Sequence, residues 1–160
     1  MPDRDITKDV LRLFSYGLYV ATSMGPDGPR AATVSWVSQA SFDPRLIAAG
    51  MRKGTAICDA VKASRRFALH VVGAEQADFA RAFFKVAQSG PDEIAGHRFT
   101  LSETGVPVFD APIAWLECEV VEEANQSGDH AIFIARVIGS GLRVPGPVLA
   151  LRDTPWHYAG

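Results

Sequence analysis

Apolar and polar positions alternate along much of this chain, and a period of two predicts strands. The longest example covers residues 113–122, where Glu117 and Glu119 alternate with apolar neighbours and indicate a half-buried strand. Residues 130–138 follow a polar turn and are predicted to pair with that strand in antiparallel fashion. The same alternation or a short apolar run predicts further strands over residues 18–23, 30–38, 46–51, 67–72 and 148–152.

Three segments show helical spacing instead. Residues 7–17 are predicted to form an opening helix with Thr7 as N-cap, and residues 56–63 a second helix. Residues 75–87 give an amphipathic third helix, whose aromatic stripe we assign to the core rather than to a cofactor, and residues 88–96 give a polar loop. Because strands dominate and the helices fall at irregular places, the pattern favours an antiparallel barrel with a few helices over a doubly wound parallel sheet.

The strand that contains Thr33 and Ser35 has a small, polar face. Side chains alternate along a strand, so Thr33 and Ser35 share one face while Val34 and Trp36 share the other. Two small hydroxyl residues leave room for a flat ligand and offer single hydrogen bonds to its edge. An ordinary strand with one solvated face is the alternative, and these residues by themselves favour it.

The run Arg52-Lys53-Gly54-Thr55 lies at a predicted junction between a strand and a helix. Free backbone amides at a helix start, together with a cation and a hydroxyl, suit a single phosphate group. Thr55 as a plain N-cap beside solvated cations is the simpler interpretation of the same four residues.

His130 follows the turn residues Gly128 and Asp129 at the start of an apolar strand. That position would direct its imidazole to the mouth of a barrel, where it would reach a ligand. A structural histidine held by Asp129 is the alternative, and without further information it is the favoured one.

Composition narrows the function classes. The 160 residues suit one domain over 1–160, and 48% hydrophobic residues make a globular chain. A net charge of −2 with interspersed acids and bases lacks the basic stripe of a nucleic-acid binder. No run reaches the ~18 apolar residues of a membrane span, and the charged N-terminus has no apolar core, so we expect a cytoplasmic protein with no membrane partner.

Missing motifs exclude several chemistries. Cys58 and Cys118 lie far apart in apolar surroundings and are expected to be buried, reduced thiols. The four histidines lack the close spacing of a zinc or iron site. Neither Gly-x-Gly-x-x-Gly, a Walker-type loop nor Gly-x-Ser-x-Gly occurs, so the usual dinucleotide, triphosphate and serine hydrolase signatures are absent from the sequence.

Several motifs in order resemble the flavin reductase-like family, whose members bind flavin mononucleotide (FMN) in a split β-barrel. The resemblance runs from about Phe14 to Tyr158. Residues 35–42 are especially similar to the flavin reductase domains of diflavin flavoproteins. The motifs that carry the resemblance are Thr33-Val34-Ser35, then Val37-Ser38-Gln39-Ala40-Ser41-Phe42-Asp43-Pro44, the strand 113–121, and Gly128-Asp129-His130.

This resemblance implies a six-stranded antiparallel split β-barrel with flanking helices. In it His130 would lie near the flavin or the nicotinamide and is the catalytic candidate. Many relatives have Asn where this chain has His70, so the contact made by that Asn is in doubt here. The implied cofactor-binding residues are Thr33, Val34, Ser35 and Trp36 at the isoalloxazine edge, Ser38, Gln39, Ala40 and Ser41 beside the flavin, and Arg52, Lys53, Gly54 and Thr55 at the phosphate, with Lys53 and Thr55 holding it.

The implied function is NAD(P)H-dependent flavin reduction, in which the cofactor performs the hydride chemistry and the protein supplies geometry and charge stabilisation. A flavin-binding electron carrier with little NAD(P)H activity and a non-catalytic flavin-binding protein are the alternatives. We expect a homodimer whose aromatic tail, with Trp156 and Tyr158, folds back near the cofactor or the partner copy. A flavin-dependent monooxygenase is a natural acceptor of reduced flavin. No residue pattern distinguishes NADH from NADPH.

Overall fold

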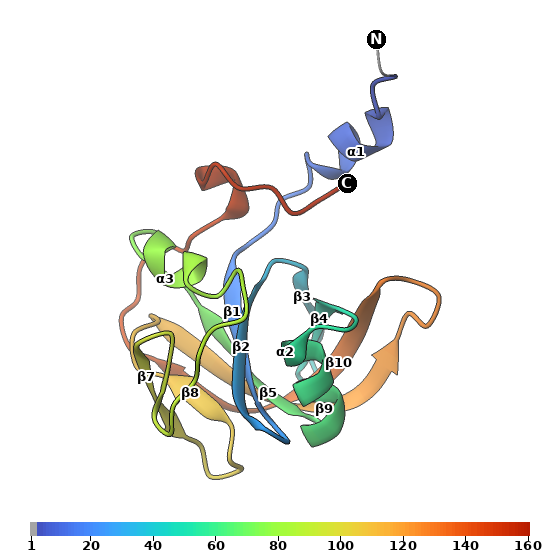
Figure 1. Ribbon diagram of the computed structural model, residues 1–160. Coiled ribbons are helices and arrows are strands. Elements are labelled where there is room, and N and C mark those ends of the chain that lie inside the picture. Colours follow the sequence, from blue (N-terminus) through green and yellow to red (C-terminus); the bar gives the residue numbers. More distant parts are fainter. Residues whose placement is uncertain (1–2) are drawn as a thin grey trace.

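The computed structural model describes residues 3–160, and a curved antiparallel sheet dominates them (Figure 1). Its seven strands run in the order β2-β1-β5-β9-β10-β4-β3. A smaller sheet, in the order β6-β7-β8, packs beside it. The strands are β1 (Tyr19–Gly25), β2 (Gly28–Val34), β3 (Val37–Ser41), β4 (Leu46–Arg52), β5 (Arg66–Val71), β6 (Glu93–Ile94), β7 (His97–Leu101), β8 (Pro107–Phe109), β9 (Ala114–Ala124) and β10 (His130–Leu142).

The large sheet is rolled, and its connectivity requires this. Strands β2 and β3 lie at opposite ends of the strand order, yet only Ser35 and Trp36 separate them. Six strand spacings of a flat sheet would cover about 29 Å, whereas the three peptide links from Val34 to Val37 reach about 10 Å. The two ends of the sheet therefore meet, and β2 contacts β4 across the seam. The mainly β, antiparallel class expected from the sequence is confirmed.

The number of strands differs from the expected six. The strand expected over residues 30–38 divides at Ser35-Trp36 into β2 and β3, and β3 adds a seventh strand beside β4. At the bend, the Gly50 amide donates to the Trp36 carbonyl at 2.8 Å. A Cβ on Gly50 would lie 3.3 Å from the Trp36 Cβ, so glycine permits this close approach. The bend explains why one alternating run makes two strands.

The prediction of a last strand over residues 148–152 is also wrong. Instead, Val148 and Ala150 make isolated bridges with Gly73 and Gly17, and a 3-10 turn, η1 (Leu151–Asp153), follows. The chain then runs as an extended tail to the C-terminus and ends beside the first helix (Figure 1).

All three helices are present, with changed bounds. Helix α1 (Ile6–Leu11) is capped by Asp5 rather than by Thr7, has no buried residue and projects from the body (Figure 1). Helix α2 (Ala56–Ser64) begins at residue 56 as expected, has Thr55 as its N-cap, and contacts β1, β2 and β4. Helix α3 (Ala77–Arg81) is shorter than expected, although its Phe79 and the following Phe83 are buried in the core, as the stripe predicted.

Glu117 does not lie on the solvated face that the alternation of β9 predicted. Its side chain is buried and accepts hydrogen bonds from the hydroxyls of Ser102, at 2.8 Å, and Thr104. Buried carboxylates need such partners. These come from the turn between β7 and β8, two strands that the local sequence pattern did not reveal.

His70 is a fully buried structural residue. Its ring bridges two segments, with Nδ1 2.9 Å from the Val20 carbonyl oxygen and Nε2 accepting from the Phe109 amide at 2.9 Å. The neutral ring with its proton on Nδ1 satisfies both contacts. Burial lowers the pKa of His70 to about 4, because desolvation disfavours the charged form. His70 therefore joins β1 to the end of β8 and lines none of the cavities described below.

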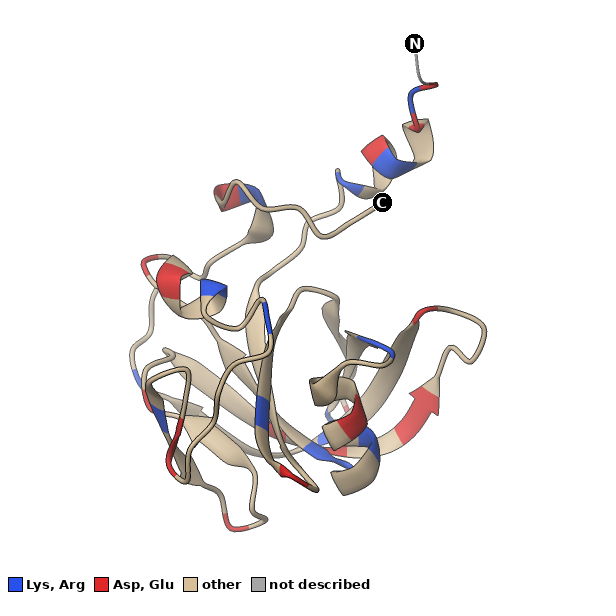
Figure 2. Cartoon of the chain, viewed as in Figure 1, with Lys and Arg blue, Asp and Glu red and all other residues tan. Residues whose placement is uncertain are grey.

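Charges of both signs are interspersed along the chain (Figure 2). Among the described residues, no helix is long and apolar enough to cross a membrane. Both cysteines are free and buried, and burial raises the pKa of the Cys118 thiol to about 12.

Candidate flavin site

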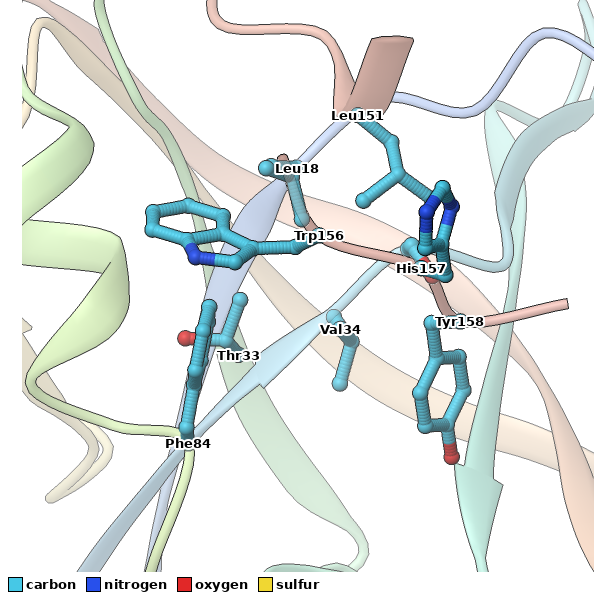
Figure 3. A pocket seen from close by; sticks show the side chains of 9 residues that line it. Leu18, Thr33, Val34, Phe84, Leu151, Trp156, His157 and Tyr158 are labelled. Atoms are coloured by element: carbon cyan, nitrogen blue, oxygen red, sulfur yellow. The ribbon is translucent and has the colours of Figure 1, made fainter. Parts of the chain in front are cut away.

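Two adjoining cavities lie along β2, on the side where the sheet ends meet. The first has a volume of about 250 Å³ and reaches from Thr33-Val34-Ser35 to the C-terminal tail (Figure 3). The second, of about 260 Å³, runs from the same strand to Arg52 at the end of β4 and to Thr55. The two share four lining residues: Thr33, Val34, Phe84 and Tyr158. Together they form one cleft, here called the seam cleft, which is long, largely apolar and of the kind that takes a flat ligand.

The first cavity has a buried hydroxyl without a partner. Ser35 is buried, lines the cavity, and its Oγ has no hydrogen-bond partner in the structure. Buried polar atoms are nearly always paired, so an unpaired hydroxyl in a residue that lines a cavity is unusual among the described residues. Thr33 also lines the cleft, but its hydroxyl donates to the Ala80 carbonyl. Of the two hydroxyls expected on this face, Ser35 is therefore the one free to donate.

An aromatic cluster borders the cleft at the start of β10. The ring centroids of Trp36 and His130 lie 4.2 Å apart with an interplanar angle of 32°. His130 Nδ1 is 2.7 Å from an Asp129 carboxylate oxygen, and Nε2 is 2.7 Å from the Tyr158 hydroxyl. The hydrogen bond to His130 lowers the pKa of Asp129, and burial raises the pKa of Tyr158. A His130 ring that carries its proton on Nδ1 can donate to Asp129 and accept from the Tyr158 hydroxyl.

The four residues 52–55 divide into two groups. Arg52 and Thr55 line the second cavity at the start of α2, and Gly54 (φ +80°) makes the turn between them. Lys53 points elsewhere, because its ammonium donates to the carbonyls of Asn125, Gln126 and Gly128 at 2.6–3.0 Å. Thr55 is an N-cap whose hydroxyl donates to the Arg52 carbonyl and accepts from the Cys58 amide. The N-cap alternative thus describes Thr55, and Arg52 is the cation at the cleft.

The remaining expected residues are separate from the cleft. Strand β3 forms the open edge of the large sheet and is mostly exposed. Ser38 donates to the Gln39 carbonyl, and the Gln39 amide donates to the Ser41 carbonyl. Neither cavity of the seam cleft is lined by the expected β3 residues, namely Ser38, Gln39, Ala40 and Ser41.

Sequence reasoning missed several walls of the cleft. Phe84 lines both cavities of the seam cleft, and Leu18 and Leu151 close the first cavity (Figure 3). Phe84 is 46% exposed although it belongs to the aromatic stripe that we assigned to the core. Its position beyond the end of α3, where the helix gives way to a turn, is the only local signal that it serves the cleft.

The chain thus combines a rolled antiparallel sheet with an apolar cleft and an unpaired hydroxyl at the seam. Its residues 11–151 match the family described as "Flavin reductase like domain". This chain belongs to that family. It is 33% identical over 138 residues, 84% of the chain, to diflavin flavoprotein A 1 of Synechocystis. It is 28% identical to the FMN reductase (NADH) SmoA of Agrobacterium fabrum, covering 88% of this chain and 78% of that protein.

Solved structures show the same fold. The styrene monooxygenase flavin reductase of Pseudomonas putida S12 superposes with a TM-score of 0.75 at 29% identity, covering 92% of this chain and 91% of that one.

The diflavin relatives are much longer proteins: the chain spans 23% of diflavin flavoprotein A 1. Its similarity to that protein is confined to one part of it.

Proposed function

We propose that this domain is a flavin reductase that binds FMN in the seam cleft and passes a hydride to it from NADH or NADPH. The observation that carries the proposal is an apolar cleft whose lining includes the buried Ser35, a residue whose hydroxyl has no hydrogen-bond partner among the described residues. The names of SmoA and of the styrene monooxygenase reductase support the same activity. The test is the visible spectrum of purified protein titrated with FMN, followed by NADH and NADPH consumption with and without added flavin. A flavin spectrum without nicotinamide consumption would favour the electron carrier.

The residues present fit a flavin. The cleft offers apolar walls from Val34 and Phe84 for a ring system, and the Ser35 hydroxyl for its polar edge. A bound flavin supplies the hydride acceptor. Ser35 and backbone donors of the adjoining segment would stabilise the negative charge that accumulates on the ring. The β3 residues Ser38, Gln39, Ala40 and Ser41 remain proposed neighbours of the cofactor, reached over the edge of the sheet.

The phosphate is proposed to bind at the start of α2. The first amides of a helix have no partner within the helix, and the adjacent Arg52 is exposed and lines the cleft. Thr55 shapes this end by capping the helix, and Gly54 lets the chain turn into it. Lys53 fixes the turn at 125–128, which leads directly into Asp129 and His130.

For the fold, we propose that six strands make the split barrel. Strands β2, β1, β5, β9, β10 and β4 follow one another around the main core, and β2 contacts β4 across the seam. Strand β3 would then be an extension of the barrel beyond β4.

His130→Ala is expected to slow hydride transfer by about tenfold while FMN affinity changes by less than a few-fold. The imidazole borders the cleft through Trp36 and Tyr158 rather than lining the two cavities itself, so its loss affects the rim more than the flavin pocket. Stopped-flow reduction of the FMN-loaded protein measures the rate. Unchanged turnover per folded molecule together with a lower melting temperature would leave His130 a structural residue.

A homodimer is the proposed assembly, with a flavin-dependent monooxygenase as the acceptor of reduced flavin. The exposed edge of β3 and exposed apolar side chains near the N-terminus support a partner copy, since Ile6 in α1 and Leu13 just after it are 69% and 81% exposed. Light scattering of the FMN-loaded protein is expected to give twice the 17.2 kDa chain mass. A monomer that retains flavin would contradict the assembly.

A further inference from the structure

The C-terminal tail lies over the seam cleft. The Trp156 ring packs edge-on against Phe84 at 4.6 Å between centroids, and Tyr158 lines both cavities (Figure 3). The Tyr158 carbonyl accepts from the Trp36 indole at 3.2 Å, and its hydroxyl contacts His130 Nε2 at 2.7 Å. The tail therefore forms part of the cleft wall and touches the aromatic cluster at two points.

In this conformation His130 has no nitrogen free for a ligand. Nδ1 is engaged by Asp129 and Nε2 by Tyr158. The Trp36 indole nitrogen, the only donor of that side chain, is also taken by the tail. A substrate that needs His130 Nε2 or the Trp36 indole nitrogen has to displace Tyr158 first.

The tail is held weakly enough to be displaced. Tyr158 is 42% exposed and His157 is exposed. Besides the two Tyr158 contacts and the Trp156 ring, the hydrogen bonds recorded for residues 155–160 are one from the Trp156 amide to the Thr154 hydroxyl and one from Arg12 to the Ala159 carbonyl. Segments with so few hydrogen bonds to the rest of the fold open at low free-energy cost.

We propose that Tyr158 is an autoinhibitory gate whose hydroxyl and carbonyl occupy His130 and Trp36 until the nicotinamide dinucleotide displaces the tail. This inference rests on the proposed function, because it makes the dinucleotide the competitor. The apparent affinity for a ligand falls with the fraction of molecules in the competent state, so weakening the gate strengthens binding. Tyr158 is a positioning residue here, since it acts through access to His130.

Tyr158→Phe keeps the ring and removes only the hydroxyl bond. We expect KM for NADH to fall about two- to tenfold, the factor that one net hydrogen bond represents. Tyr16→Phe is the matched control, because the Tyr16 hydroxyl donates to the Leu11 carbonyl at 3.0 Å and lines no cavity along β2. The control is expected to leave KM unchanged. An equal or higher KM in Tyr158→Phe would overturn the gate.

A second measurement does not depend on turnover. The chain has three tyrosines, so 3-fluorotyrosine labelling gives few fluorine resonances, and Tyr158→Phe identifies one of them. Adding NAD⁺ to the FMN-loaded protein is expected to move that resonance toward the position of free fluorotyrosine. A Tyr158 resonance that keeps its position or moves in the opposite direction contradicts displacement of the tail by the dinucleotide. Protein that binds no NAD⁺ contradicts it as well. Wild-type protein that oxidises neither NADH nor NADPH refutes the proposed function instead, whereas an active enzyme with unchanged KM in Tyr158→Phe refutes the gate alone.

Discussion

Lowering the pH from 7 to 4 is expected to cost this protein about 3 kcal/mol of unfolding free energy through His70 alone. Burial lowers the pKa of His70 to about 4 in the folded state, whereas the unfolded chain titrates near 6.5. The unfolded state therefore binds the proton first. The neutral, buried His70 therefore makes its full contribution to the free energy of unfolding above pH 6.5, and this contribution is lost progressively as the pH falls toward 4.

Urea unfolding at intervals of half a pH unit measures this slope, and His70→Asn is the control. An amide can still pair with one of the two backbone groups that His70 holds, the Val20 carbonyl and the Phe109 amide, but it has no proton to gain. Its profile is expected to lack the His70 component while it keeps the contribution of the carboxylates. Parallel profiles for the two proteins would show that His70 does not titrate on unfolding in this range.

Arg52→Ala is expected to weaken FMN binding by about tenfold to a hundredfold while riboflavin binding stays nearly unchanged. A hydrogen bond to a charged group contributes roughly 1.5–3 kcal/mol, and riboflavin has no phosphate with which to form it. The guanidinium lies at the end of the cleft beside the first turn of α2, where the backbone amides add to the attraction. Fluorescence titration of both ligands into each variant gives the two affinities.

Lys53→Ala and Thr55→Ala complete that comparison. If these side chains hold the phosphate, each variant also loses FMN affinity selectively. Their bonds favour a different result, because Lys53 holds three carbonyls of the turn 125–128 and Thr55 caps α2. Loss of an N-cap costs ~1 kcal/mol of stability and affects both ligands alike. Equal losses for FMN and riboflavin in Arg52→Ala would remove the phosphate from this end of the cleft.

The sequence predicted the features that depend on local periodicity. Burial along β10 follows the two-residue alternation over most of its length, β9 covers most of the range expected for it, and α2 follows the expected N-cap Thr55. The small sheet escaped prediction because β6 has two residues and β8 three, too few for any period to appear. The burial of Glu117 was not predicted either, because its partners Ser102 and Thr104 lie in the turn between two strands of that sheet.

The candidate site was predictable in part. Thr33, in β2, and Ser35, which follows that strand, both line the first cavity, and the alternation alone predicted that they lie together. The direction of Lys53 was not predictable, because three carbonyls of a distant turn compete for its ammonium. Nor was the place of Ser38–Ser41, since the bend at Trp36 moves β3 to the other end of the sheet order. Contacts between segments remote in sequence decided both cases.

The short link at Ser35 and Trp36 also makes the cleft sensitive to chain length. One residue inserted there would exchange the two faces of β3 relative to β4, because the side-chain period of a strand is two residues. Two inserted residues would restore the faces and let the sheet ends separate. Variation in the length of this link is thus a means by which related chains can widen or narrow the opening without replacing any residue that lines it.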